Sequence, residues 1–203
     1  VLILFVLIAI LGPLVWQVDP LKQSVMKKYG PMTVQHPLGT DNLGRDTLAR
    51  MIYGARVSLA LSFAGVLSGA LIGVLLGVSA GYFGGWVDLV FQRIIDIWGA
   101  TPLLYVIIIV AAIWRMDFWL LVSIMVVFGW TSLRGVVRAE FLRARNFEYV
   151  RAARALGVPD RVIMFRHVLP NAMVATLTML PFLITGAIGT LAMLDFLGFG
   201  LPA

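Results

Sequence analysis

Five long stretches without a charged side chain constrain the fold of this chain more than any other feature. A helix needs about 20 mostly apolar residues to cross a bilayer, and each stretch comes near that length. The chain has 203 residues, of which 61% are hydrophobic and 13% charged. A water-soluble domain of this size cannot bury so much apolar surface, so the sequence predicts an all-α, polytopic transmembrane helix bundle. The expected spans are residues 1–18, 57–87 (roughly Leu59 to Ala80), 97–114 (starting near Val90), 118–133 and 168–194.

Two of the connecting segments are long, namely residues 19–56 and residues 134–167. Strict alternation of spans places them on opposite sides of the membrane. Eight of the 16 Lys and Arg lie in 134–167, and all eight are Arg. With that loop inside, nine basic residues lie inside and seven outside, which favours this orientation only weakly. Because the sequence starts at Val1 and stops at Ala203, we expect it to be truncated at both ends.

The second expected span contains a glycine at every fourth position. At 3.6 residues per turn, such a row drifts slowly around a helix and forms an inclined groove. Another helix can approach closely there, so the row predicts helix packing rather than a ligand site. The glycines are Gly65, Gly69, Gly73, Gly77 and Gly81.

The arginine-rich segment contains the pattern of two short helices between residues 146 and 170. Asn and Asp side chains can cap helix N-termini, Gly favours the end of a helix, and Pro prevents its continuation. Asn146 and Asp160 are therefore the expected caps, Gly157 and Pro159 the expected break, and Pro170 the junction with the fifth span.

The first of these helices has two faces. Tyr149, Ala152, Ala153 and Leu156 fall at i, i+3, i+4 and i+7, while Arg151 and Arg154 lie on the other face. Small alanines between two larger anchors suit docking into a groove of another protein. A helix lying on the membrane surface, with Arg toward lipid phosphates, fits the periodicity equally well.

The spacing of Ala152, Ala153, Gly157, Leu169 and Pro170 resembles the signature loop of ABC importer permeases. In that family the loop forms the coupling helix, which sits in a cleft of a cytoplasmic ATPase subunit. The resemblance therefore implies that 134–167 is a cytoplasmic coupling loop, with Tyr149, Arg151 and Leu156 at the contact. Arg151 stands where the family usually has Glu and His167 where Ile is usual, and the peptide subgroup often tolerates both changes.

A second motif reads His-Pro-Leu-Gly-Thr-Asp-Asn-Leu-Gly-Arg-Asp at 36–46, followed by Tyr-Gly-Ala-Arg-Val-Ser at 53–58. It is similar to the N-terminal signature of the C-type oligopeptide/dipeptide/nickel permeases. The first part predicts a turn, and Asp46 can cap an interfacial helix feeding the second span. Asp41, Asn42 and Asp46 do not have the spacing of a calcium loop, so capping is the favoured interpretation. The signature positions are His36, Gly39, Thr40, Asp41, Gly44, Arg45 and Asp46.

A third stretch, residues 194–202, looks like the segment after the fifth span in the same family. The resemblance implies a type I ABC importer fold with a sixth span beyond the end of this sequence. It divides the chain into a first transmembrane helix (1–18), an extracytoplasmic segment with an interfacial helix (19–56) and a truncated type-1 core (57–203). The wording of 138–146, 171–178 and 195–200 is closest to permeases of the microcin C type.

Several chemistries lack their motifs. There is no Walker A, HExxH or GxSxG pattern, so a partner must hydrolyse ATP. No Cys is present, and His36 and His167 fall on opposite sides, so we expect no metal site and no cofactor. The rival readings are a membrane-embedded enzyme and a membrane scaffold or channel without an ATPase. Within the spans, Arg93 and Asp96 could pair at i, i+3.

The resemblance also implies an assembly in the bacterial inner membrane. Its expected members are a second permease subunit forming a heterodimer, two cytoplasmic ABC ATPase subunits and an extracytoplasmic solute-binding protein. Membrane lipid is expected around the spans, and nucleic acid is not an expected partner. The implied cargo is a peptide or peptide-like solute, microcin C-type compounds included, with nickel or another solute as the alternative.

Overall fold

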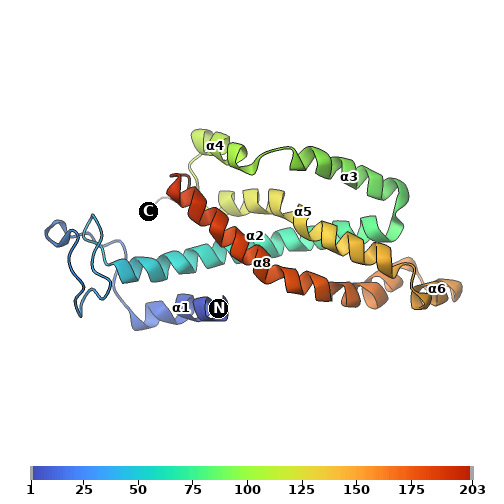
Figure 1. The fold of residues 1–203 in the computed structure, drawn as a ribbon, viewed down its shortest axis with the longest axis horizontal. Coiled ribbons are helices and arrows are strands. Elements are labelled where there is room, and N and C mark those ends of the chain that lie inside the picture. Colours follow the sequence, from blue (N-terminus) through green and yellow to red (C-terminus); the bar gives the residue numbers. More distant parts are fainter. Residues whose placement is uncertain (1, 202–203) are drawn as a thin grey trace. The chain divides into compact units, whose positions relative to one another are not determined.

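The computed structural model describes residues 2–201, and its regular elements are helices (Figure 1). The chain forms two compact units, residues 2–62 and residues 63–201. The elements in chain order are α1 (Leu2–Val15), η1 (Val25–Lys27), α2 (Thr47–Phe83), α3 (Gly85–Gly99), α4 (Leu103–Ile113), α5 (Phe118–Ala144), α6 (Glu148–Ala155), α7 (Asp160–Val162), η2 (Ile163–Val168) and α8 (Leu169–Phe196).

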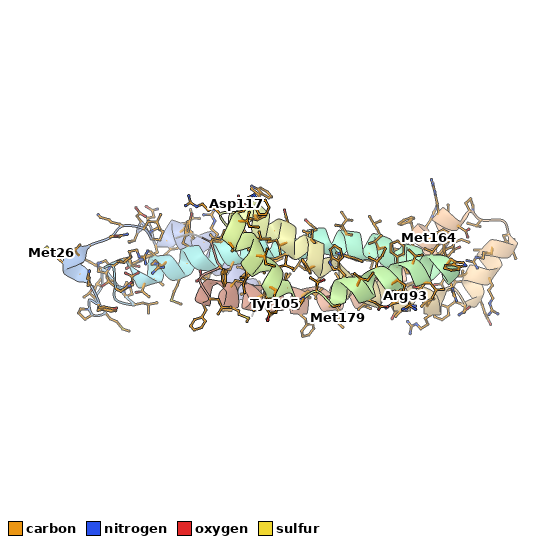
Figure 2. All side chains as sticks on the ribbon, turned by 90° about the horizontal axis from the view of Figure 1, so that it is seen from above. Met26, Arg93, Tyr105, Asp117, Met164 and Met179 are labelled. Atoms are coloured by element: carbon orange, nitrogen blue, oxygen red, sulfur yellow. The ribbon has the colours of Figure 1, made fainter. Side chains whose placement is uncertain are left out.

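Three helices are long and apolar enough to cross a membrane, namely α2, α5 and the continuous run from Asp160 to Phe196. A fourth crossing results if α3 and α4 form one bent span. The expected first span is the 14-residue helix α1, which is shorter than the length that spans a bilayer core unaided. The structure thus supports three or four of the five expected spans. Tyr105 and Met179 stand out from their helices with exposed side chains, as expected of surfaces that face lipid (Figure 2).

The expected third span is not one straight helix. α3 ends at Gly99, α4 begins at Leu103, and the two are bent by 65°. Pro102 explains the break, because a proline restricts the residue before it to extended backbone and has no N–H to donate.

The turn between α2 and α3 is short. α2 continues to Phe83, and α3 begins at Gly85. Gly84 and Gly85 have φ values of 64° and 51°, which glycine adopts without the steric cost of a Cβ atom. Two residues therefore suffice to reverse the chain.

The glycine row of α2 lies against α5. A Cβ atom added to Gly73 would sit 2.5 Å from the carbonyl oxygen of Trp130, and one added to Gly77 would sit 2.8 Å from that of Arg134. Gly81 faces Phe141 and the backbone of Arg138 in the same way. The two backbones approach so closely that any side chain at these positions would overlap α5.

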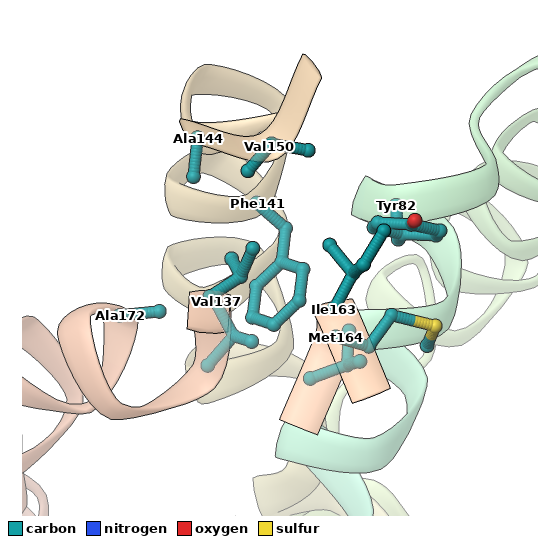
Figure 3. Packing of buried hydrophobic residues seen from close by; sticks show 10 residues of the cluster. Tyr82, Val137, Phe141, Ala144, Val150, Ile163, Met164 and Ala172 are labelled. Carbon is teal, nitrogen blue, oxygen red and sulfur yellow. The ribbon is translucent and has the colours of Figure 1, made fainter. Parts of the chain in front are cut away.

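A cluster of buried apolar side chains holds the end of the second unit together, and we call it the inner cluster (Figure 3). Its members come from the ends of α2 and α5, from α6, from η2 and from the start of α8. They are Val78, Tyr82, Val137, Phe141, Ala144, Val150, Ile163, Met164, Val168 and Ala172. The cluster fixes the short helix α6 to the long helices.

Candidate functional site

α6 begins and ends differently from the sequence prediction. Its N-cap is Phe147 rather than Asn146, whose side-chain amide donates instead to the carbonyl of Leu142 at 3.4 Å. Gly157 follows the helix with φ of 77°, as expected of a glycine that stops a helix. An N-cap residue has extended backbone angles, and here Phe147 has them. The helix therefore begins after Phe147, one residue later than a cap at Asn146 would place it.

Asp160 is likewise not a cap. Pro159 occupies the N-cap position of α7, and Asp160 is its first residue. The carboxylate of Asp160 accepts a hydrogen bond from the hydroxyl of Tyr82 instead. A side chain expected to serve its own helix therefore joins α7 to α2.

α6 has a side that packs on the inner cluster and a side that is exposed, and Ala153 lies on the packed side. Val150 is fully buried in the inner cluster, and Ala153 packs partly buried against it. Tyr149, Ala152 and Leu156 are exposed, Leu156 to 82%, and together they form what we call the outer face of α6. The expected four-residue face is therefore wrong at Ala153, which lies on the inward side.

Arg154 ties the far end of α6 to the rest of the unit. Its Nε donates to the Tyr82 hydroxyl at 3.3 Å, and its guanidinium lies 4.8 Å from the centre of the Tyr82 ring. The same Nε lies 3.8 Å from a carboxylate oxygen of Asp160. α6 is thus held by an apolar contact on one side and by a polar linkage at its end.

The connection from α7 to α8 is unbroken at Pro170. η2 is wound as a π-helix, and the backbone N–H of Leu169 bonds to the carbonyl of Met164, five residues earlier. Pro170 lacks an N–H and would crowd the carbonyl four residues before it in ordinary α winding. The wider π turn accommodates that proline, so the expected junction is a continuous helix from Asp160 to Phe196. Leu169 packs partly buried against the inner cluster, while Pro170 is exposed.

A charged network lies between α3 and α5. Arg138 donates to both carboxylate oxygens of Asp88 at 2.5 Å, and Arg134 reaches Asp88 at 3.4 Å. Arg134 is only 2% exposed and also donates to Gln92 at 3.0 Å, while its Nε has no hydrogen-bond partner among the described residues. Burial makes such a network costly to break, because each charge would be left unpaired in an apolar setting.

The sequence analysis did not predict this network. The available signal was two arginines four residues apart, with Asp88 at the start of the preceding apolar helix. The expected pair of Arg93 and Asp96 is present at 3.5 Å with both side chains well exposed.

A polar hollow lies beside α6 in the second unit. It is lined by side chains from the end of α2, the segment after α5, α6 and α7: Tyr82, Phe83, Arg145, Asn146, Arg154 and Asp160. Arg145, Arg154 and Asn146 have side-chain N–H groups that can donate hydrogen bonds to an anion in this hollow.

The signature positions of the first unit fold into a compact turn around Asp41. Its carboxylate accepts from the backbone N–H groups of Leu43 and Arg45 at 2.8 and 2.9 Å, and pairs with the guanidinium groups of Arg45 and Arg50 at 2.8 and 2.5 Å. Burial alone would raise the pKa of Asp41, but these hydrogen bonds outweigh it and hold the pKa well below its usual value. Its oxygens are occupied by N–H donors, which is unlike a cation site.

Asp46 caps α2, as the sequence predicts. It accepts from the backbone N–H of Ala49 at 2.6 Å and from the indole N–H of Trp16 at 3.1 Å. His36 Nδ1 lies 2.8 Å from its other oxygen, and Lys27 Nζ lies 3.2 Å from the other ring nitrogen of His36. Burial opposes ionisation of Asp46, but the bonds from Ala49, His36 and Trp16 lower its pKa overall.

The remaining signature residues shape the backbone of this turn. Thr40 donates through its hydroxyl to the carbonyl of Lys27 and accepts from the N–H of Gly30 at 2.8 Å. Gly39 and Gly44 have φ values of 69° and 72°, a region that favours glycine. A side chain at Gly44 would overlap the backbone of Ser24. The structure therefore explains why each of these signature positions has the residue type it has.

Comparison with known proteins points to one family. Residues 73–203 match the family described as "Binding-protein-dependent transport system inner membrane component". That match covers the inner cluster, the charged network and α6.

Individual relatives agree with the family match. The chain is 60% identical over 165 residues to the peptidoglycan transport system permease protein YejE of Agrobacterium fabrum, covering 81% of this chain and 43% of the relative. It is 55% identical over 172 residues to the inner membrane ABC transporter permease protein YejE of Escherichia coli, covering 85% and 50%. It is 34% identical over 203 residues to the oligopeptide transport system permease protein OppC of Bacillus subtilis, covering 100% and 67%. The chain spans about half the length of the first two relatives.

Proposed function

Because the chain belongs to the family of binding-protein-dependent transport system inner membrane components, we propose that it is a channel subunit of an ATP-driven importer. In this proposal a separate ATPase drives the subunit through the segment 146–170. The observation that carries the proposal is the outer face of α6, where Tyr149, Ala152 and Leu156 are exposed on a helix that Val150 anchors in the inner cluster.

The packing of α6 supports a mechanical role. Val150 in the inner cluster and Arg154 on Tyr82 fix the helix to α2 and to the helix that starts at Asp160. A displacement of α6 by a partner would therefore move the long helices instead of being absorbed in a loose loop. Alternating access by movement of packed helices requires such a transmission.

The proposed assembly contains a second permease subunit, two cytoplasmic ATPase subunits and an extracytoplasmic solute-binding protein. In this arrangement 134–167 lies in the cytoplasm and 19–56 outside it. ATP is bound by the partner, and the permease itself carries no catalytic residue and no cofactor. The family description contains the words "binding-protein-dependent" and "inner membrane". These words support a solute-binding protein as a partner and the inner membrane as the location.

The proposed cargo is a peptide or peptide-like solute. Relatives named for oligopeptide transport and for peptidoglycan transport support this class. Cross-linked cell wall yields peptide-containing fragments, and microcin C-type compounds share the peptide chemistry, so both belong to the proposed class. Uptake of labelled peptides by cells with and without the gene tests the cargo separately from the coupling.

The sharpest test of the coupling role places a reactive thiol on the outer face of α6. Residues 1–203 contain no Cys, so Leu156→Cys introduces the one thiol within them, and any Cys elsewhere in the full-length protein is replaced by Ser. In intact membranes we expect a bifunctional crosslinker at this thiol to capture the ATPase subunit. Capture of lipid alone at this position would reject the coupling role and favour a helix lying on the membrane surface.

A charge on the same face provides a matched test. Ala152→Asp would bury a carboxylate without a partner at the contact, so we expect at least about a tenfold loss of ATPase binding to the permease. Ala139→Asp places the same change at an exposed alanine of α5, away from α6, and should leave binding intact. Equal binding by the two variants, measured by co-purification from membranes, would contradict the proposal.

A further inference from the structure

The polar hollow beside α6 contains one arginine whose guanidinium makes no ion pair with the described residues. Arg154 shares its charge with Asp160 at 3.8 Å and bonds to Tyr82. Arg145 also lines the hollow, and within residues 2–201 it makes no ion pair and donates no side-chain hydrogen bond. Two arginines and one aspartate give the hollow a formal charge of +1.

The position of Arg145 has a structural reason that leaves its donors free. Its Nη1 lies against Gly84, where any side chain would collide with the guanidinium. The carboxyl ends of α2 and α5 meet there, and helix C-termini favour a nearby cation. A planar guanidinium held in this way still presents N–H groups in the fork geometry that matches phosphate and carboxylate oxygens.

The hollow lies beside the turn where α2 leaves its apolar stretch, and beyond the ends of the apolar stretches of α5 and α8. The uncharged run of α2 ends at the turn to α3, that of α5 ends at Arg134, and that of α8 begins after His167. Phe83 lines the hollow with an exposed ring, and Trp86 is 81% exposed two residues beyond the turn. Aromatic side chains of this kind concentrate at the depth of lipid headgroups.

We propose that this hollow binds a phosphate group, held by the guanidinium groups of Arg145 and Arg154. The exposed ring of Trp86 at the neighbouring turn favours an anionic phospholipid headgroup as the carrier of that phosphate. A single negative charge matches the formal +1 of the hollow, so a phosphodiester fits better than a doubly charged phosphate. Tyr82 already donates to Asp160, and Asn146 uses one of its two amide N–H groups on Leu142, so the two arginines supply most of the free donors. The site adjoins the proposed ATPase contact, since Asn146, Arg154 and Asp160 lie in the segment 146–170, but it includes none of the outer-face residues of α6.

The test uses the full-length permease in its assembled transporter. Reconstituted into nanodiscs of phosphatidylcholine with phosphatidylglycerol, the wild type should retain phosphatidylglycerol on extraction, as measured by native mass spectrometry. Arg145→Gln should weaken this retention about tenfold, the effect of losing one charge-assisted pair. Arg145→Lys keeps the charge and should retain part of the binding.

Arg143→Gln is the matched control, because Arg143 is exposed near the end of α5, lies outside the segment 146–170 and does not line the hollow. Thermal unfolding of each assembled variant verifies that lost retention does not reflect lost folding. A parallel arm measures stabilisation of the detergent-purified transporter by inorganic phosphate. Phosphate stabilisation that depends on Arg145, without lipid retention, would assign the site to a free anion. Equal lipid retention and equal phosphate response in Arg145→Gln and wild type would overturn the proposal.

Discussion

Tyr82 joins three segments of the chain through one side chain. Its hydroxyl donates to Asp160 at the start of α7, it accepts from Arg154 of α6, and its ring packs in the inner cluster. The phenol side chain has an apolar ring and a polar hydroxyl group. At the boundary of the inner cluster, the ring can pack inside the cluster while the hydroxyl forms hydrogen bonds outside it. The hydrogen bonds that link α2 to α6 and α7 here therefore meet at a single oxygen atom.

Tyr82→Phe removes that oxygen and keeps the ring. We expect the second unit to lose about 1 kcal/mol of unfolding free energy, the net value of a hydrogen bond of this kind. Tyr105→Phe is the control, because Tyr105 is exposed and its hydroxyl has no bond within residues 2–201. Thermal unfolding of the purified transporter compares the two, and equal midpoints would show that the hydroxyl does not stabilise α6.

Asp46 gives the first unit a predictable response to acid. Its pKa is lowered in the folded chain by bonds from Ala49, His36 and Trp16 against the effect of burial. A lowered pKa contributes stability that is present above the unfolded pKa of about 3.9 and is lost as the pH falls below it. We therefore expect the turn around Asp41 and Asp46 to lose stability below about pH 4. Between pH 5 and 8 both carboxylates stay ionised, so their contribution to stability should not change.

Trp16 reports this change, because its indole N–H bonds to Asp46. In a chain whose other tryptophans are replaced by Phe, its fluorescence should shift toward that of exposed indole as the pH falls through this window. Asp46→Asn should remove the transition, whereas Asp19→Asn, which alters an exposed loop carboxylate, should keep it. A transition that persists in Asp46→Asn would assign the acid response to another group.

At the scale of elements, the packing of α2 on α5 depends on bare backbone. Gly73→Ala would place a methyl group 2.5 Å from the carbonyl oxygen of Trp130, and that backbone atom cannot move aside without shifting α5. Overpacking of this kind costs about 1–3 kcal/mol. We expect a lower unfolding midpoint and less assembled transporter in membranes.

Gly135→Ala is the matched control for this prediction. A Cβ atom at Gly135 meets nothing within 4 Å, and alanine favours helix over glycine by roughly 1 kcal/mol. The same substitution should therefore be neutral or stabilising at 135 and harmful at 73. Comparable midpoints for both variants would mean that the two helices are not packed as closely as the structure has them.

The elements also show where sequence reasoning succeeds. The uncharged runs predicted the positions of α2, α5 and α8, because burial of apolar surface in a bilayer leaves few alternatives for such stretches. Asp46 was correctly expected to cap α2. The caps at Asn146 and Asp160 failed, because the backbone angles at Phe147 and Pro159, set by packing of α6 and α7, decided which residue occupies the cap.

At the scale of the whole molecule, the features missed are those that join distant parts of the sequence. Asp88 meets Arg138 across 50 residues, and Tyr82 meets Asp160 across 78. No periodicity within one segment carries information about such pairs, so they emerge only when the helices are placed together. The family motif pointed to the segment 146–170, but only the packing of Val150 and Ala153 separated its inner side from its outer face.

The π-wound turn before Pro170 has a consequence for chain length. This π-helical turn contains one residue more than an α-helical turn between the same neighbouring helical segments. Deletion of one residue within 163–168 could therefore be absorbed by conversion of the π-helical turn to an α-helical turn. A deletion elsewhere between Asp160 and Phe196 would instead rotate everything beyond it by about 100° and turn lipid-facing side chains toward the interior. Gain or loss of a residue along this helix is therefore confined to one turn, and the rest of it can vary only by substitution.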